Sequence, residues 1–183
     1  MAIETTRAVD ASWGRLYSGV VKSALVTILT GVVLLSVASP APAQEAIYLV
    51  RHAERANQSA DSPLSTEGVG RARRLGDMLK DAGITRIFTS ELRRTIETAA
   101  PLASAIHVGP QQIPGDADSL AAKIAASNAR DRVLVVGHSN TLPALLHALH
   151  VEPPITIADD AYDNLFIVVF PRDGRPVLLR LKY

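Results

Sequence analysis

Short apolar runs alternate with longer polar and apolar segments from residue 46 onward. The runs 46–50, 84–89 and 132–137 are rich in Ile and Val and are bounded by turns or charges. Such runs are typical of strands that are buried on both faces of a parallel sheet. Near the end of the chain, residues 164–170 and 177–183 flank an Asp-Gly pair, which predicts two strands joined by a tight turn.

Between these runs, apolar residues recur at spacings of three and four, which predicts helices. In residues 65–83 the recurrence is clear, with Ser65 as a candidate N-cap and Gly83 as the stop. Pro101 is expected to bend or restart a second helix, because proline lacks the N–H that a helix interior needs. The other segments with helical spacing are 91–106, 117–129 and 140–150.

The alternation of strands and helices predicts the fold class. Strands separated by helices of this length form βαβ units, in which helices cover both faces of a mostly parallel sheet. We therefore expect a three-layer α/β/α sandwich with a C-terminal edge hairpin. In such open sheets, ligands bind outside the carboxyl ends of the parallel strands, so the residues just after each strand are the first candidates for a functional site.

The first 43 residues have the pattern of an export signal. Three basic residues precede an apolar or small run from Ala24 to Ala38, and Ala41 and Ala43 follow at the spacing that signal peptidases prefer. The run is shorter than the roughly 20 residues that a membrane-spanning helix needs. We expect residues 1–43 to be a signal peptide cleaved after Ala43, which predicts a periplasmic or secreted protein. The alternative is an uncleaved segment that anchors the protein to the membrane.

Residues 44–183 then form one domain, with a size that supports a workable core. This part carries 16 basic and 16 acidic residues, so its formal net charge is zero. A neutral balance argues against a nucleic-acid partner bound by bulk charge. The chain has no cysteine, which excludes thiol nucleophiles and thiolate metal sites.

Basic and imidazole side chains follow each of the three predicted parallel strands. Arg51 and His52 follow the first strand, Arg93 and Arg94 come soon after the second, and His138 follows the third. Guanidinium groups match the oxygens of a phosphate, and helix N-termini add backbone donors. An imidazole in the same place can attack phosphorus, since histidine is a competent nucleophile near neutral pH. The set therefore favours phosphoryl chemistry.

Four segments resemble, in order, the motifs of the histidine phosphatase superfamily, also called phosphoglycerate mutase-like, in its small single-domain branch. "LVRHAE" (49–54) is similar to the family's strand followed by Arg-His-Gly, with Ala53 in place of glycine. "PLSTEG" (63–68) looks like its Leu-Ser/Thr-x-x-Gly turn. "TSELRRTIETA" (89–99) looks like its Ser-x-Leu-x-Arg-x-x-x-Thr-Ala segment, and "VVGHSNT" (135–141) like its Gly-His segment.

This resemblance implies roles for individual residues. His52 would be the nucleophile that becomes phosphohistidine, Arg51 and Arg94 would clamp the phosphoryl oxygens, and His138 would donate a further hydrogen bond. Arg93 is left as a charge on the helix surface. No metal and no cofactor are expected, because these cationic groups supply the charge stabilisation that Mg²⁺ often gives. The implied substrate is a phosphomonoester, either a small molecule or a phosphorylated macromolecule.

The family also uses a carboxyl group that protonates the leaving oxygen and later activates water. The corresponding place is the loop before residue 119, where we favour Asp116. Its rival Asp118 could instead be the N-cap of the following helix. Glu54, beside the nucleophile, is a third candidate. The asparagine that mutase-type members carry nearby is not clearly in register, because Asn57 and Gln58 straddle the position.

The sequence leaves two other functions to consider, a serine hydrolase and a binding module. A serine hydrolase would place Ser139 on a strand-to-helix turn, but Thr141 replaces the second glycine of that motif, the chain is short for that fold, and no Asp-then-His order follows the serine. A binding module of the same fold would hold a phosphorylated ligand without hydrolysing it. Loss of the acid carboxylate would have that outcome, so the ambiguity at Asp116 leaves this alternative open.

Two further features favour structural explanations over functional ones. His147 and His150 lie three residues apart, a spacing that could serve a metal, but no third ligand is evident. The segment "DDAYDN" (159–164) is typical of a turn with carboxylate capping, although it could also line the entrance for the substrate.

Overall fold

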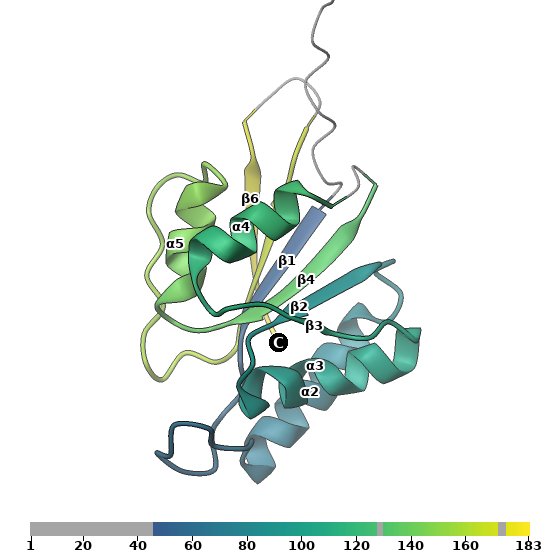
Figure 1. The fold of residues 1–183 in the computed structure, drawn as a ribbon, viewed down its shortest axis with the longest axis vertical. Helices are drawn as coiled ribbons and strands as arrows, with labels where there is room; N and C mark the ends of the chain where they lie inside the picture. Colours follow the sequence, from purple (N-terminus) through teal and green to yellow (C-terminus); the bar gives the residue numbers. More distant parts are fainter. Residues whose placement is uncertain (1–45, 128–129, 172–174) are drawn as a thin grey trace, which may run out of the picture. The chain divides into compact units, whose positions relative to one another are not determined.

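The computed structural model describes residues 46–183 apart from 128–129 and 172–174, so the expected signal peptide and the Asp-Gly turn lie outside the described residues. A six-stranded sheet has the order β3-β2-β4-β1-β5-β6 (Figure 1). Its strands are β1 (Ala46–Arg51), β2 (Arg86–Thr89), β3 (Gln111–Gln112), β4 (Arg132–Gly137), β5 (Asn164–Val169) and β6 (Val177–Lys182). The helices are α2 (Thr66–Leu79), α3 (Arg93–Ile106), α4 (Ala117–Ala125) and α5 (Thr141–Ala148).

The sheet is parallel on one side of β1 and antiparallel on the other. Strands β1, β4, β2 and β3 pair in parallel, whereas β5 is antiparallel to both β1 and β6. This arrangement confirms the predicted mostly parallel sheet with a C-terminal edge hairpin. The short strand β3 was not predicted, because two exposed glutamines carry no strand signal.

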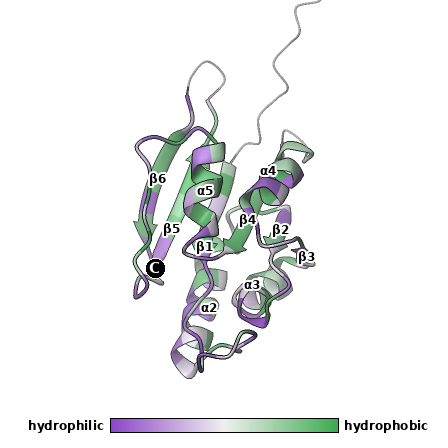
Figure 2. Cartoon of the chain, turned by 60° about the vertical axis from the view of Figure 1, so that its left-hand side comes forward, coloured by the Kyte–Doolittle hydropathy of each residue, from purple (hydrophilic) through white to green (hydrophobic). Residues whose placement is uncertain are grey.

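Helices cover both faces of the sheet, as the buried strands require. Ile47 and Leu49 of β1 pack in the cluster that contains the apolar residues of α4 and α5. Val50, which points to the opposite face, packs in the cluster with Leu75 of α2 and Leu102 of α3. Figure 1 shows α2 beside α3 on one side of the sheet, and Figure 2 shows that the central strands are mostly hydrophobic while the helices mix both colours. The three-layer α/β/α sandwich is therefore confirmed.

The helix boundaries agree with the sequence only in part. Ser65 is the N-cap of α2 and accepts a hydrogen bond from the backbone N–H of Gly68, as expected. However, α2 ends at Leu79, and Gly83 lies beyond it with a positive φ of 70°. The expected restart at Pro101 is wrong, because α3 runs through this residue as one helix packed along α2.

The fold brings the carboxyl ends of three parallel strands together. Arg51 at the end of β1 pairs in register with Gly137 at the end of β4, and Thr89 at the end of β2 pairs with Val136. The start of α2 supports the loop that leaves β1, since a Cβ on Gly68 would collide with the carbonyl oxygen of Glu54. The residues that follow these strands therefore share one edge of the sheet.

Candidate active site

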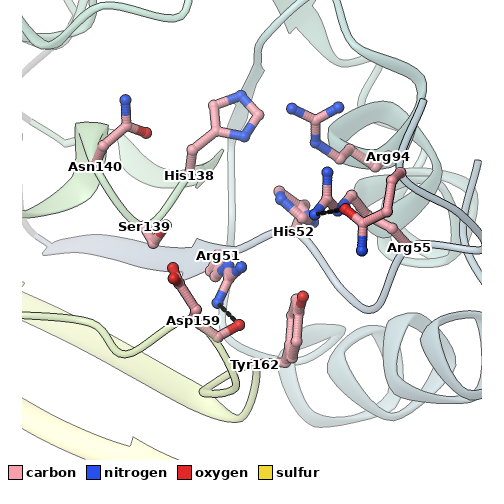
Figure 3. Close-up of a pocket in the computed structure, with 10 residues that line it drawn as sticks. Arg51, His52, Arg55, Arg94, His138, Ser139, Asn140, Asp159 and Tyr162 are labelled. Atoms are coloured by element: carbon pink, nitrogen blue, oxygen red, sulfur yellow. Dashed lines mark hydrogen bonds between the residues drawn. The ribbon is translucent and has the colours of Figure 1, made fainter. Parts of the chain in front are cut away.

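A cavity of about 500 Å³ opens at this edge, and the predicted phosphate-binding residues lie in its wall. Arg51, His52, Arg94 and His138 all line it, which places the predicted cationic and imidazole groups around one space (Figure 3). The remaining lining residues are Arg55, Gln58, Ser139, Asn140, Asp159 and Tyr162.

His52 is buried and held in one tautomer. Its Nδ1 lies 2.8 Å from the carbonyl oxygen of Ala53, an acceptor, so Nδ1 must carry the proton of that hydrogen bond. In a neutral imidazole the lone pair is then on Nε2. The backbone is also fixed, because His52 N donates to Gly137 O at 3.0 Å and Ala53 N donates to the hydroxyl of Thr98 at 2.9 Å. His52 is therefore prepared to act as a nucleophile through Nε2.

The surroundings keep His52 uncharged. Burial lowers the pKa of His52 to about 3, against the opposing effect of the hydrogen bond to Ala53. The nearby charges of His138, Arg94 and Arg51 lower this pKa further. An imidazole with this pKa is neutral at physiological pH and keeps the lone pair that an attack on phosphorus requires.

Arg51 and Arg94 both offer N–H groups to the cavity. Nη1 of Arg51 donates to the backbone oxygens of Ala158 and Asp159 at 3.0 and 2.8 Å, and Nη1 of Arg94 donates to Ala60 O at 2.8 Å. The Nε atoms of both side chains are buried and have no hydrogen-bond partner in the described part of the chain. Arg51 is buried and Arg94 is half-buried, and guanidinium groups at a cavity wall are well suited to bind a phosphoryl group.

His138 faces His52 across the cavity. The two ring centroids are 5.3 Å apart, and Nε2 of His138 lies 3.1 Å from the hydroxyl oxygen of Ser90. This contact fixes the orientation of the His138 ring. Burial lowers the pKa of His138 to about 4, with a further decrease from Arg94. Both imidazoles are thus neutral at neutral pH, and the formal positive charge comes from the arginines.

The three carboxylates considered from the sequence do not line the cavity. Asp116 is the N-cap of α4, where its side chain accepts from the backbone N–H of Ser119 at 2.8 Å. The expectation that Asp118 is this cap is wrong; Asp118 lies in the first turn and is exposed. Glu54 instead accepts a hydrogen bond from Arg71 at 2.7 Å. The catalytic role of Asp116 stays a prediction.

The pKa values of two of these carboxyl groups do not match a proton donor. The hydrogen bond from the Ser119 backbone lowers the pKa of Asp116. Burial raises the pKa of Glu54, but the hydrogen bond and charge of Arg71 outweigh this effect and lower it overall. Both groups are therefore held as carboxylates, whereas a general acid must carry a proton.

Four cavity residues come from segments without a recognised motif. Gln58 is one of the two residues that straddled the uncertain motif position, and Arg55 donates to its side-chain oxygen at 2.8 Å. Tyr162 lies under Arg51, with the guanidinium carbon 4.0 Å from the ring centroid. Asp159 and Tyr162 belong to the 159–164 segment. The sequence favoured a capped turn for this segment over a place at the substrate entrance, yet both residues line the cavity.

The described residues contain no group of three or more His, Cys, Asp or Glu side chains placed to hold a metal ion. His147 and His150 are both exposed and lie outside the cavity. Among the described helices, none combines the length and apolar character needed to cross a membrane.

Lowering the pH from 7 to 5 should reduce the free energy of unfolding, partly through His52 and His138. Their folded-state pKa values lie below the ordinary value of 6.5, so between these values the unfolded chain binds protons that the folded chain does not. This contribution is complete above pH 6.5 and is lost as the pH falls, by at most about 1.4 kcal/mol per pH unit for each imidazole. Partial solvent exposure keeps the contribution below that limit.

Urea unfolding at pH 7 and pH 5 measures this effect. His138→Gln should lose less stability over the interval than the wild type, whereas the exposed control His147→Gln should behave like the wild type. An identical pH dependence in all three proteins would contradict the low pKa of His138.

Comparisons with known proteins support the fold and the first three motif segments, 49–54, 63–68 and 89–99. Residues 47–115 match the sequence model described as "Histidine phosphatase superfamily (branch 1)". The "Probable phosphoglycerate mutase GpmB" of Proteus mirabilis (strain HI4320) is 42% identical over 66 residues, which cover 32% of this chain and 31% of the relative. That of Klebsiella pneumoniae subsp. pneumoniae is 41% identical over the same length. The chain thus spans less than a third of these curated relatives.

Solved structures of similar fold cover most of the described chain. The protein histidine phosphatase SixA complexed with tungstate superposes with a TM-score of 0.61 at 20% identity, over 75% of this chain and 96% of that one. The putative phosphohistidine phosphatase SixA from Agrobacterium tumefaciens has a TM-score of 0.57 at 22% identity, over 76% and 98%. Phosphoglycerate mutase from Bacillus anthracis str. Sterne has a TM-score of 0.56 at 18% identity, over 77% and 94%.

Proposed function

Because this chain belongs to the histidine phosphatase superfamily, we propose that it is an exported phosphatase that hydrolyses a phosphomonoester through a phosphohistidine on His52, without a metal ion. The observation that carries the proposal is the state of His52. The carbonyl of Ala53 holds its Nδ1 proton, its low pKa keeps the ring neutral, and Arg51 lies beside it in the same cavity wall. A neutral imidazole with Nε2 free, next to guanidinium donors, is the arrangement that attack on a phosphoryl group needs.

The proposed reaction has two steps. In the first, the Nε2 lone pair of His52 forms a bond to phosphorus while the ester P–O bond breaks, and the leaving oxygen takes a proton from a carboxyl group. In the second, the resulting carboxylate takes a proton from the water that attacks phosphorus, the N–P bond breaks, and inorganic phosphate leaves with His52 restored. Arg51 and Arg94 bind the phosphoryl oxygens throughout, and His138 donates to the group in transfer. These contacts stabilise the charge that develops on the oxygens.

Hydrolysis is favoured over mutase chemistry by the size of the domain. The longest segments between the described strands and helices are 52–65 and 149–163, and neither forms a further helix or strand that would enclose a bisphosphorylated cofactor. Water can therefore compete for the phosphohistidine. The alternative is a phospho-ligand-binding module of the same fold, and the capping position of Asp116 outside the cavity wall favours that alternative.

One experiment tests both activity and export. The full chain, expressed in a Gram-negative host, should give a periplasmic product that is shorter by residues 1–43 and hydrolyses 4-nitrophenyl phosphate equally well with and without EDTA. Loss of activity in EDTA would contradict the metal-free mechanism. Active protein of full length in the cytoplasm would contradict export alone. Periplasmic protein that is stabilised by phosphate against heat, yet has no turnover, would support the binding module.

A further inference from the structure

We propose that Asp159 is the carboxyl group that protonates the leaving oxygen and then activates water, a role for which the sequence favoured Asp116. This inference rests on the proposed phosphatase function and deepens it. The leading observation is positional: of the residues that line the cavity in the described part of the chain, Asp159 is the one with a carboxyl group. A general acid must reach the substrate, so position is the first criterion for the role.

The phosphate-binding arginine itself fixes the position of Asp159. Nη1 of Arg51 donates to the backbone oxygen of Asp159 at 2.8 Å and to that of Ala158 at 3.0 Å. Ala161 N donates to Ala158 O at 3.0 Å, which closes the turn, and the ring of Tyr162 packs against the Arg51 guanidinium. A phosphoryl group bound by Arg51 would therefore lie at a defined place relative to Asp159.

The direction of approach suits proton donation to the leaving group. In phosphoryl transfer the attacking and leaving atoms lie roughly in line, so the acid belongs on the side opposite to the nucleophile. Figure 3 shows the Asp159 carboxylate and His52 on opposite sides of the Arg51 guanidinium. Asp159 is exposed at the mouth of the cavity, where the rest of the substrate would leave and water would enter.

The other carboxyl groups considered for this role are engaged elsewhere. Asp116 is bonded to the backbone at the start of α4, and removing it from this position would leave the N–H of Ser119 without its cap. Glu54 is bonded to Arg71. Asp160, the neighbour of Asp159 in the chain, is exposed but does not line the cavity, which makes it a matched control.

The proton balance closes over the two steps. As His52 displaces the ester oxygen, the carboxyl group of Asp159 gives its proton to that oxygen and becomes a carboxylate. The carboxylate then takes a proton from the water that attacks the phosphohistidine. Inorganic phosphate leaves, and both His52 and Asp159 return to their starting states.

The test compares two phosphate esters that differ in their need for an acid. In the purified protein, Asp159→Asn should reduce kcat/KM for ethyl phosphate by about 10²-fold or more, because ethoxide leaves poorly without a proton. For 2,4-dinitrophenyl phosphate the same variant should retain kcat/KM within about tenfold, since this phenolate leaves unaided. It should also release a burst of phenolate, because hydrolysis of the phosphohistidine has lost its base. Asp160→Asn should match the wild type with both esters, and Asp116→Asn tests the rival assignment.

Several results would overturn this assignment. One is an Asp159→Asn variant with the kcat/KM of the wild type for both esters. Another is an equal loss of kcat/KM for both esters in that variant. The third is a loss confined to ethyl phosphate in Asp116→Asn instead of Asp159→Asn. Thermal unfolding of each variant checks that the fold is intact. A wild type that hydrolyses neither ester would overturn the proposed function itself, and the role of Asp159 with it. The first three results leave phosphatase activity in place, so the two failures are distinguishable.

Discussion

Replacement of His52 by glutamine should reduce kcat for 4-nitrophenyl phosphate by at least about 10³-fold and abolish the phosphoenzyme. Glutamine keeps a polar side chain of similar reach but has no lone pair on nitrogen that can attack phosphorus. Nδ1 of His52 already bonds to Ala53, so the substitution removes Nε2, the nitrogen that would attack phosphorus. The measurement is steady-state hydrolysis, together with acid-labile ³²P on the protein after rapid quenching.

Two controls make this result specific to His52. His147→Gln changes an exposed histidine outside the cavity and should leave both activity and labelling unchanged. Binding of inorganic phosphate, measured by calorimetry, should survive in His52→Gln, because Arg51 and Arg94 remain. Undiminished turnover in His52→Gln would rule out the phosphohistidine mechanism and leave the fold assignment intact.

The sequence was sufficient to find the cavity residues that follow the parallel strands. Arg51, His52 and His138 each follow an apolar run directly, and Arg94 lies in the helix after β2. In a parallel sheet the carboxyl ends of neighbouring strands meet at one edge, so the order of strand and polar residue already predicts proximity. The register of β1 with β4 is what makes this inference correct here.

The other wall of the cavity could not be predicted in the same way. Asp159 reaches Arg51 across 108 positions in the chain, through a backbone carbonyl that any residue would supply. No side-chain pattern encodes such a contact, and a turn rich in aspartate looks the same whether or not a cavity lies beside it. The choice between Asp116 and Asp118 as helix cap failed for a related reason. Both are good caps two residues apart, and helix ends are uncertain by that distance.

After His52, Arg51 should be the position where substitution lowers activity most. Its guanidinium would bind the phosphoryl group and also holds the opposite wall of the cavity. Arg51→Ala should reduce kcat/KM by about 10²–10³-fold, the range that follows from removing one donor to the transferring group. Arg51→Lys should recover little of this loss. An ammonium group lacks the planar fork with which one side chain donates to Ala158 O and Asp159 O and keeps further N–H groups for a phosphoryl oxygen.

The contribution of Arg51 to the wall can be separated from its charge. Arg93→Ala removes a neighbouring guanidinium of the same charge that is paired with Glu97 on the surface, and should change kcat/KM by less than about threefold. Tyr162→Phe keeps the ring against Arg51 and should also change kcat/KM by less than about threefold. Tyr162→Ala removes the ring and should raise KM, because the guanidinium and the 158–162 turn lose this packing contact. Near-complete recovery of kcat/KM in Arg51→Lys would mean that positive charge alone is required. In that case Arg51 would not position Asp159, because a lysine cannot reproduce its two backbone contacts along with the one to phosphate.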